Sequence, residues 1–287
     1  MLTNIHCFDA YCYTGGKPFN PVQPTAVFIH GAQHDHSIWI LQTRYFAHHG
    51  FNVLAVDLPG HGRSKGAALT SVEAVADWLL ALLDAAGVEK AMLIGHSMGS
   101  LAALEVAHRA PQRVSKLALV GTAYPMKVSD TLLDAAKNAE QNAIDMVNLW
   151  SHTSVAQKPS SPGPGFYVMG VNRRLMQRIS KTNPEHVFYT DFSACNAYAN
   201  GDIAAQSVQC PTLFLLARRD IMTPIKASAG LIRAIAHAQV VQLDHCGHNL
   251  MAEQPDQVLD VLYSFANTFS ASAARYETKA GTNSRGT

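Results

Sequence analysis

One short segment of the chain combines the residue types and the spacing of a nucleophilic site. Gly95-His96-Ser97-Met98-Gly99 matches the pattern G-x-S-x-G, and it stands between an apolar run and a stretch of small residues. In that context the serine tops a sharp strand-to-helix turn, and its hydroxyl is exposed above the sheet. The pattern predicts that Ser97 is a nucleophile. The alternative is an ordinary N-cap serine with coincidental glycines, since serine is a common cap.

A serine hydroxyl is a poor nucleophile at neutral pH, so it needs a base and a third group that orients the base. Two later segments supply these partners. Asp220 follows one apolar run, and His248 follows the next. We therefore expect Ser97, Asp220 and His248 to meet at one edge of a sheet, although they are far apart along the chain.

Three neighbouring residues are rivals for these roles. Asp244 lies at the end of the last apolar run, beside the histidine segment, and His245 lacks the glycine that precedes His248. We favour His248 as the base and Asp220 as the acid. His96 is better explained as a residue packed beside the nucleophile than as a second base.

The run His34-Asp35-His36 carries three groups that can bind a metal ion. Adjacent residues of one loop rarely converge on a single ion, and serine-based hydrolysis needs none. We therefore expect a solvated loop there, with no metal site and no cofactor.

Apolar runs and helical patterns alternate along the first part of the chain and again near its end. Strands are expected at 26–30, 52–57, 90–95, 116–121, 212–217 and 240–243. Helices are expected at 38–49, 71–86, 97–110 and 225–236, and Pro255 opens another. A hairpin around Gly15–Gly16 or Asp9 is expected before them. The alternation predicts an α/β fold with a mostly parallel central sheet and helices on both faces.

The alternation stops between residues 123 and 207. Helical patterns occupy 129–150, 168–181 and 184–199, and a loop rich in Pro, Gly and Ser at 158–165 interrupts them. We interpret 123–207 as a helical cap inserted into a core formed by 1–122 and 208–270. Residues 271–287 lack an amphipathic pattern, and a flexible tail is expected there.

In combination, these motifs resemble the α/β-hydrolase superfamily, in its capped esterase- and lipase-like form, over nearly the full length of the chain. His30-Gly31 resembles the oxyanion loop of that family. Asp57-Leu-Pro-Gly-His-Gly-Arg-Ser64 resembles the loop after its second strand, and Gly247-His248-Asn-Leu-Met-Ala-Glu253-Gln-Pro255 resembles its histidine loop. The resemblance implies a catalytic triad of Ser97, Asp220 and His248.

The resemblance also implies an oxyanion hole formed by the backbone N–H groups of Ala32 and Met98. Two features depart from the family pattern. Ala217 stands where the acid loop often has a glycine, and the oxyanion loop reads His-Gly-Ala-Gln instead of the glycine triplet of some esterases.

Aromatic and methionine side chains gather in the expected cap. Most of them must pack the cap onto the core, but a few can line an apolar pocket above the nucleophile. We expect Trp150, Tyr124 and Met222 to contact substrate. The cap also carries a basic face, which we expect to be solvated; contact with an anionic substrate such as a coenzyme A thioester is the alternative. Its residues are Arg173, Arg174, Arg178 and Lys181.

The expected reaction is hydrolysis of a carboxylic ester, or of a thioester, through an acyl-enzyme on Ser97. Related reactions with the same triad remain open, namely carbon–carbon bond hydrolysis and cofactor-free haloperoxidase or perhydrolase chemistry. A ligand receptor without turnover is also open. A serine at position 97 argues against the haloalkane dehalogenase and epoxide hydrolase families, which resemble this one but react through a carboxylate.

Composition limits the partners of this chain. The formal net charge is +1, so no electrostatic argument favours nucleic acid or an anionic membrane. No apolar run approaches the ~20 residues that cross a bilayer, and the first residues lack a signal-peptide pattern. Five scattered cysteines are typical of reduced thiols. We expect a cytoplasmic protein whose partner is a small-molecule substrate, with a homodimer left open.

Overall fold

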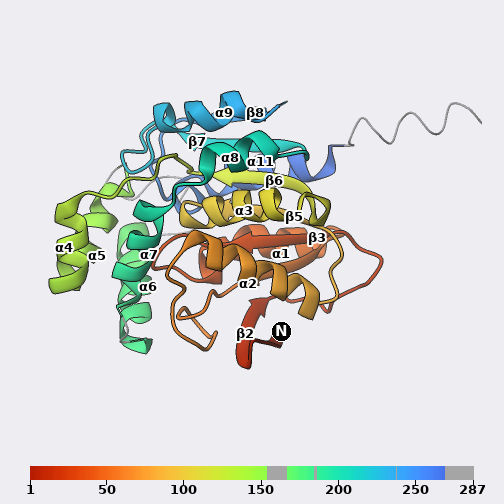
Figure 1. The fold of residues 1–287 in the computed structure, drawn as a ribbon, viewed down its shortest axis with the longest axis horizontal. Helices are drawn as coiled ribbons and strands as arrows, with labels where there is room; N and C mark the ends of the chain where they lie inside the picture. The colour runs from red at the N-terminus through yellow and green to blue at the C-terminus, as the bar shows by residue number, and fades with distance from the viewer. Residues whose placement is uncertain (154–166, 184–185, 237, 269–287) are drawn as a thin grey trace, which may run out of the picture.

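A computed structural model describes residues 1–153, 167–183, 186–236 and 238–268 (Figure 1). In these ranges eight strands form one sheet, in the order β1-β2-β4-β3-β5-β6-β7-β8. Strands β3 to β8 run parallel to one another, and β2 pairs antiparallel with both β1 and β4. The strands are β1 Leu2–Ile5, β2 Phe8–Tyr13, β3 Thr25–Ile29, β4 Asn52–Val56, β5 Ala91–His96, β6 Val114–Val120, β7 Thr212–Ala217 and β8 Ala238–Leu243.

Helices cover the sheet on both faces. The α-helices are α1 Ile40–His48, α2 Val72–Ala85, α3 Met98–Arg109, α4 Asp130–Asn138, α5 Glu140–Trp150, α6 Val168–Thr182, α7 Val187–Ala197, α8 Gly201–Ser207, α9 Ala229–Ala234, α10 Leu250–Glu253 and α11 Pro255–Asn267. Short 3-10 turns are η1 His36–Trp39, η2 Pro111–Arg113 and η3 Ile225–Ser228. This arrangement confirms the predicted α/β class, with its mostly parallel sheet.

Alternate side chains of each central strand enter two separate cores. In β3, Val27 and Ile29 pack in the core that contains α2 and α3, whereas Phe28 packs on the opposite face with α1 and α11. Every residue of β3, β4, β5 and β7 is buried, because both faces are covered by helices. For this reason the sequence shows these strands as continuous apolar runs.

The N-terminal hairpin turns earlier than expected. Strands β1 and β2 are joined at His6-Cys7, and both residues have positive φ. Neither residue is a usual choice for such a turn, which favours glycine and asparagine, so no local signal marks it. Gly15 also has positive φ, but it follows β2, where a Cβ would lie 2.3 Å from that of Ala47.

The segment between β6 and β7 is helical, as expected, but it is divided differently. The stretch predicted as one helix over 129–150 breaks at Ala139, whose backbone is not helical (φ −152°, ψ 57°), into α4 and α5. Helices α4 to α7 stand together beside the sheet (Figure 1), while α8 packs on α3 and α9. The 158–165 loop and the 271–287 tail lie outside the described residues. Within those residues, no helix combines the length and the apolar character needed to cross a bilayer.

Candidate active site

Ser97 occupies the turn between β5 and α3, in the backbone conformation that its motif predicts. Its φ is 51° and its ψ is −119°, a strained conformation for a residue with a Cβ. The flanking glycines are required sterically. A Cβ on Gly95 would lie 2.1 Å from the carbonyl oxygen of Gly99, and a Cβ on Gly99 would lie 2.5 Å from that of His30. The side chain of Ser97 lines a cavity and is half-buried.

Asp220 and His248 lie side by side at the carboxyl ends of β7 and β8. The Nδ1 of His248 lies 2.7 Å from Oδ2 of Asp220, and both residues are 5% exposed. The second carboxylate oxygen, Oδ1, accepts the backbone N–H groups of Met222 and Thr223, each at 2.8 Å. Since a carboxylate only accepts, the Nδ1 of His248 carries the proton, and Nε2 is left to act as a base.

The hydroxyl of Thr223 also contacts this pair. It lies 2.6 Å from Oδ2 of Asp220 and 3.0 Å from Nδ1 of His248, and it approaches the carbonyl oxygen of Gly121 at 3.0 Å. Nothing in the sequence pattern singles out this threonine. It completes the ring of polar groups around the acid.

The surroundings keep Asp220 ionised. Burial by itself would raise the pKa of this carboxyl, but the charge of His248 and the hydrogen bonds from His248 and Thr223 outweigh it. The net result lowers the pKa of Asp220 to about 2. The carboxylate beside His248 is therefore ionised, as the acid of a Ser-His-Asp triad would need to be.

Two buried groups hold the segment around His248. The carboxylate of Glu253 accepts the backbone N–H of Gly247 at 2.5 Å and is 3% exposed. The Nε2 of His96 donates to the carbonyl oxygen of His248 at 2.9 Å. Burial and the neighbouring His248 depress the pKa of His96 well below its usual range, so this ring is neutral. It is packed beside the nucleophile, as predicted, and acts as a support for the histidine loop.

The rival partners lie elsewhere. Asp244 forms an exposed ion pair with Arg218, with Nε and Oδ1 3.0 Å apart. His245 is exposed and has a φ of 61°. Neither residue lines the cavity that contains Ser97. Of these candidates, His248 lines the cavity together with Ser97, and Asp220 is the carboxylate that contacts His248.

The two expected oxyanion donors lie next to Ser97. Met98 is the first residue of α3, and the loop after β3 brings Ala32 to the lining of the same cavity. A Cβ on the preceding Gly31 would be only 3.1 Å from the Cβ of Ser97, so the loop touches the nucleophile. Among the described residues, no protein acceptor takes the backbone N–H of either Ala32 or Met98.

The cavity above Ser97 has a volume of about 300 Å³. Trp150 and Met222 contribute to its wall as expected, but Tyr124 does not. The ring of Tyr124 packs on Tyr198 instead, with the ring centroids 5.8 Å apart. The other lining residues, which sequence reasoning did not select, are Met126, Lys127, Val128, Ser129, Leu132, Phe192, Cys195, Ile221 and Thr223. Several are apolar residues of cap helices, and no local pattern distinguishes them from residues that pack the cap.

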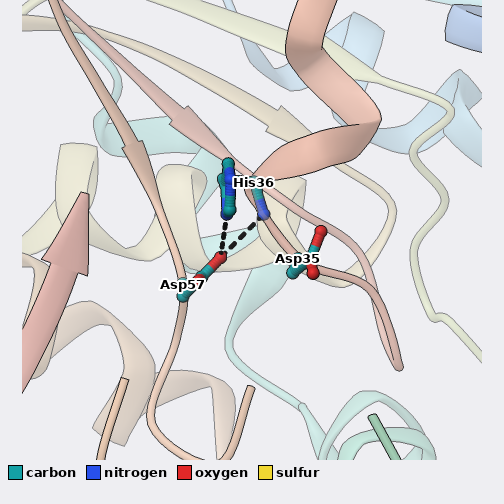
Figure 2. A group of neighbouring side chains, drawn as sticks. All are labelled: Asp35, His36 and Asp57. Atoms are coloured by element: carbon teal, nitrogen blue, oxygen red, sulfur yellow. Dashed lines mark hydrogen bonds and ion pairs between the residues drawn. The ribbon is translucent and has the colours of Figure 1, made fainter. Parts of the chain in front are cut away.

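The expectation of a solvated loop at 34–36 is wrong, because His34 and Asp35 are buried and the polar groups of this segment bind within the protein. Figure 2 shows Asp35, His36 and Asp57, whose ligand atoms lie within 4.8 Å of one another. Oδ1 of Asp57 accepts both the backbone N–H and the Nδ1–H of His36, at 2.8 and 2.7 Å (Figure 2). Asp35 accepts from Ser37 and pairs with Arg178 of α6. These contacts join the loop after β3 to the loop after β4 and to the cap.

Known proteins share this architecture. Residues 24–255 match the family model described as the alpha/beta hydrolase fold. A hydrolase from Acinetobacter baylyi that acts on (E)-2-((N-methylformamido)methylene)succinate is 23% identical over 252 residues, or 84% of this chain and 90% of that protein. The enol-lactonase from Burkholderia xenovorans superposes with a TM-score of 0.80 at 21% identity, covering 93% of this chain and 100% of that chain. An N-acyl homoserine lactone degrading enzyme gives 0.78 at 22%, covering 92% and 100%. Because the family match spans most of the chain, this protein belongs to the α/β hydrolase fold family.

Proposed function

We propose that the protein is a serine hydrolase that cleaves carboxylic esters through an acyl-enzyme on Ser97. One observation carries the proposal: a strained serine, and a histidine paired with a buried, ionised aspartate, line the same cavity. Hydrolase relatives of the same fold support the general reaction class. The names of the structural neighbours favour a simple or cyclic ester as the substrate.

In the proposed reaction, Oγ of Ser97 attacks the ester carbonyl carbon while Nε2 of His248 takes the hydroxyl proton. The backbone N–H groups of Ala32 and Met98 stabilise the oxyanion that forms. The bond to the leaving alcohol then breaks, and His248 returns the proton to that oxygen. Water repeats the sequence on the acyl-enzyme, which releases the carboxylic acid and restores the serine. Asp220 keeps the imidazole in the required tautomer throughout.

The cavity wall supports a small, largely apolar substrate. The wall combines apolar side chains such as Trp150, Leu132 and Phe192 with few polar groups. We assign α4 to α7 as a cap above the nucleophile, because Trp150 ends α5 and Phe192 lies in α7. Under this proposal Tyr124 supports the base of the cap and does not contact the acyl group.

A fluorophosphonate probe tests the nucleophile. We expect one adduct, on Ser97, when the labelled protein is digested and mapped by mass spectrometry. The adduct should be lost in Ser97→Ala and in His248→Ala, since the hydroxyl needs its base. Ser129 lines the same cavity, but its hydroxyl caps α4 by accepting the backbone N–H of Leu132, so Ser129→Ala should retain the label. Labelling of another residue in the wild type would refute the proposal.

Turnover separates an enzyme from a receptor with the same site. The wild type should release p-nitrophenol from a short p-nitrophenyl ester continuously, and Ser97→Ala should not release it above background. Labelling of Ser97 without release of nitrophenol would instead indicate a receptor that retains the triad.

A further inference from the structure

The loop that carries Ala32 is held in an unfavourable conformation. Gln33, the next residue, has a φ of 55° and is fully buried. A residue with a side chain is strained in this region, and it stays there only where its surroundings hold it. Because Ala32 directly precedes Gln33, the groups that hold Gln33 also affect where the Ala32 amide lies.

Two histidines donate hydrogen bonds to backbone carbonyl groups of this loop. The Nδ1 of His30 donates to the carbonyl oxygen of Gly31 at 2.8 Å, and the Nδ1 of His34 donates to that of Ala32, also at 2.8 Å. The first bond orients the peptide plane that contains the N–H of Ala32. The second orients the plane that follows it. Both rings are buried.

Helices of the proposed cap bind the backbone N–H and the side chain of Gln33 in the same loop. Oδ2 of Asp191, in α7, accepts the backbone N–H of Gln33 at 2.8 Å. The Gln33 side chain is anchored by α6, because its Nε2 donates to the carbonyl oxygen of Met176 at 3.0 Å and to Oγ of Ser180 at 2.7 Å. Two cap helices thus bind Gln33, one residue beyond the expected oxyanion donor.

The carboxylate of Asp191 has a fixed charged partner. Its Oδ2 also lies 2.9 Å from Nε2 of His61, and both residues are 2% exposed. The Nδ1 of His61 lies 3.0 Å from the carbonyl oxygen of Pro59. Both ring nitrogens of His61 thus face acceptors, which favours its protonated form. Burial opposes this charge, but Asp191 outweighs it and raises the pKa of His61.

We propose that Asp191 is a positioning residue for the oxyanion hole. The carboxylate fixes the Ala32–Gln33 peptide, which adjoins the peptide that carries the Ala32 N–H, and so it limits how far that N–H can turn away from the reacting carbonyl. This role rests on the proposed ester hydrolysis. It makes the oxyanion hole dependent on the seating of the cap, although Asp191 itself touches no reacting atom.

A pair of substrates distinguishes positioning from simple support of the fold. Phenyl butyrate develops a negative oxygen in the transition state, whereas O-phenyl thionobutyrate develops a negative sulfur, which accepts hydrogen bonds weakly. A misplaced N–H therefore slows hydrolysis of phenyl butyrate more than hydrolysis of O-phenyl thionobutyrate. Loss of folded protein lowers both rates equally, and it leaves their ratio unchanged.

We expect Asp191→Ala to lower kcat/KM for phenyl butyrate about 10- to 100-fold, mainly through kcat, and to lower the oxygen-to-sulfur preference at least several-fold. Asp191→Asn keeps an acceptor oxygen of the same size, so its preference should fall between that of Asp191→Ala and the wild type. The matched control is Asp145→Asn. It removes a carboxylate of α5 that pairs with Arg173 at the exposed cap surface, and it should leave both rates within about two-fold of the wild type.

The outcomes are separable. If the wild type hydrolyses phenyl butyrate but both Asp191 variants keep the wild-type oxygen-to-sulfur preference, the positioning role is wrong and the proposed function stands. If the wild type hydrolyses neither ester and Ser97 takes no fluorophosphonate, the proposed function fails and this role fails with it.

Discussion

At the level of single residues, Asp220 holds a charge almost out of contact with water. Burial alone would neutralise a carboxyl group in such a place. Here the carboxylate receives hydrogen bonds from His248, from two backbone amides and from the hydroxyl of Thr223. The environment that orients the imidazole is therefore the same one that keeps the acid ionised.

This coupling predicts how stability depends on pH. The pKa of Asp220 is about 2 in the folded protein, against 3.8 for an unperturbed group, despite the opposing effect of burial. A lowered pKa stabilises the fold above pH 3.8, and this stabilisation is lost as the pH falls toward 2. Urea unfolding at pH 5 and at pH 2 should show the wild type losing roughly 2 kcal/mol more than Asp220→Asn. Parallel losses in the two proteins would contradict the assignment.

At the level of elements, the site depends on how closely α3 approaches β3 and β5. A Cβ on Gly99 would meet the carbonyl oxygens of His30 and Ile29 at 2.5 and 2.6 Å, so the second residue of α3 must lack a side chain. The approach places the amino end of α3 at the nucleophile, where its unpaired N–H groups and positive dipole favour an oxyanion. The packing of α3 thus places hydrogen-bond donors where they can stabilise an oxyanion.

We predict that Gly99→Ala destabilises the protein by about 1–3 kcal/mol, because backbone atoms must shift to admit the methyl group. It should also reduce esterase activity, since the shift moves the Met98 amide. Gly230→Ala is the matched control, because nothing lies within 4 Å of the added Cβ in α9. That variant should be neutral or more stable. Urea midpoints and p-nitrophenyl butyrate rates measure both effects, and an unchanged midpoint in Gly99→Ala would disprove the packing argument.

At the level of the whole molecule, the cavity is formed where the helices between β6 and β7 meet the carboxyl ends of the strands. Ser97, His248 and Ala32 follow strands β5, β8 and β3, while Trp150 and Phe192 come from α5 and α7. Its volume of about 300 Å³ lies at the small end of the range for ligand pockets. Under the proposed function, the arrangement of α5 and α7 around the cavity limits the length of the acyl group.

Short acyl chains should accordingly be preferred. We expect kcat/KM for p-nitrophenyl butyrate to exceed that for p-nitrophenyl dodecanoate by at least about ten-fold, the discrimination that a few kcal/mol of pocket contacts can provide. Trp150→Ala should shift the optimum toward longer chains. Leu149→Ala changes the neighbouring residue of α5, which is 56% exposed and does not line the cavity, so its chain-length profile should match the wild type. A wild-type optimum at dodecanoate would contradict this interpretation.

The sequence by itself determined the sheet, the helical stretch between β6 and β7, and the places of Ser97, Asp220 and His248 after β5, β7 and β8, because their signals are local. Burial on both faces makes a parallel strand a continuous apolar run, as in β3 and β5. A nucleophile elbow must place glycines two residues on either side of its serine, so five consecutive residues specify its shape. Asp220 and His248 each follow such a run, which is why their placement was predictable.

Only the tertiary structure decided which cap residues reach the site. Phe192 lines the cavity and Tyr124 does not, although both are aromatic residues of the same insertion. Asp191 binds the amide of Gln33, which lies 158 positions earlier in the chain. Such contacts depend on where whole helices come to rest on the sheet, and this position results from many small packing interactions that no short run of residues encodes.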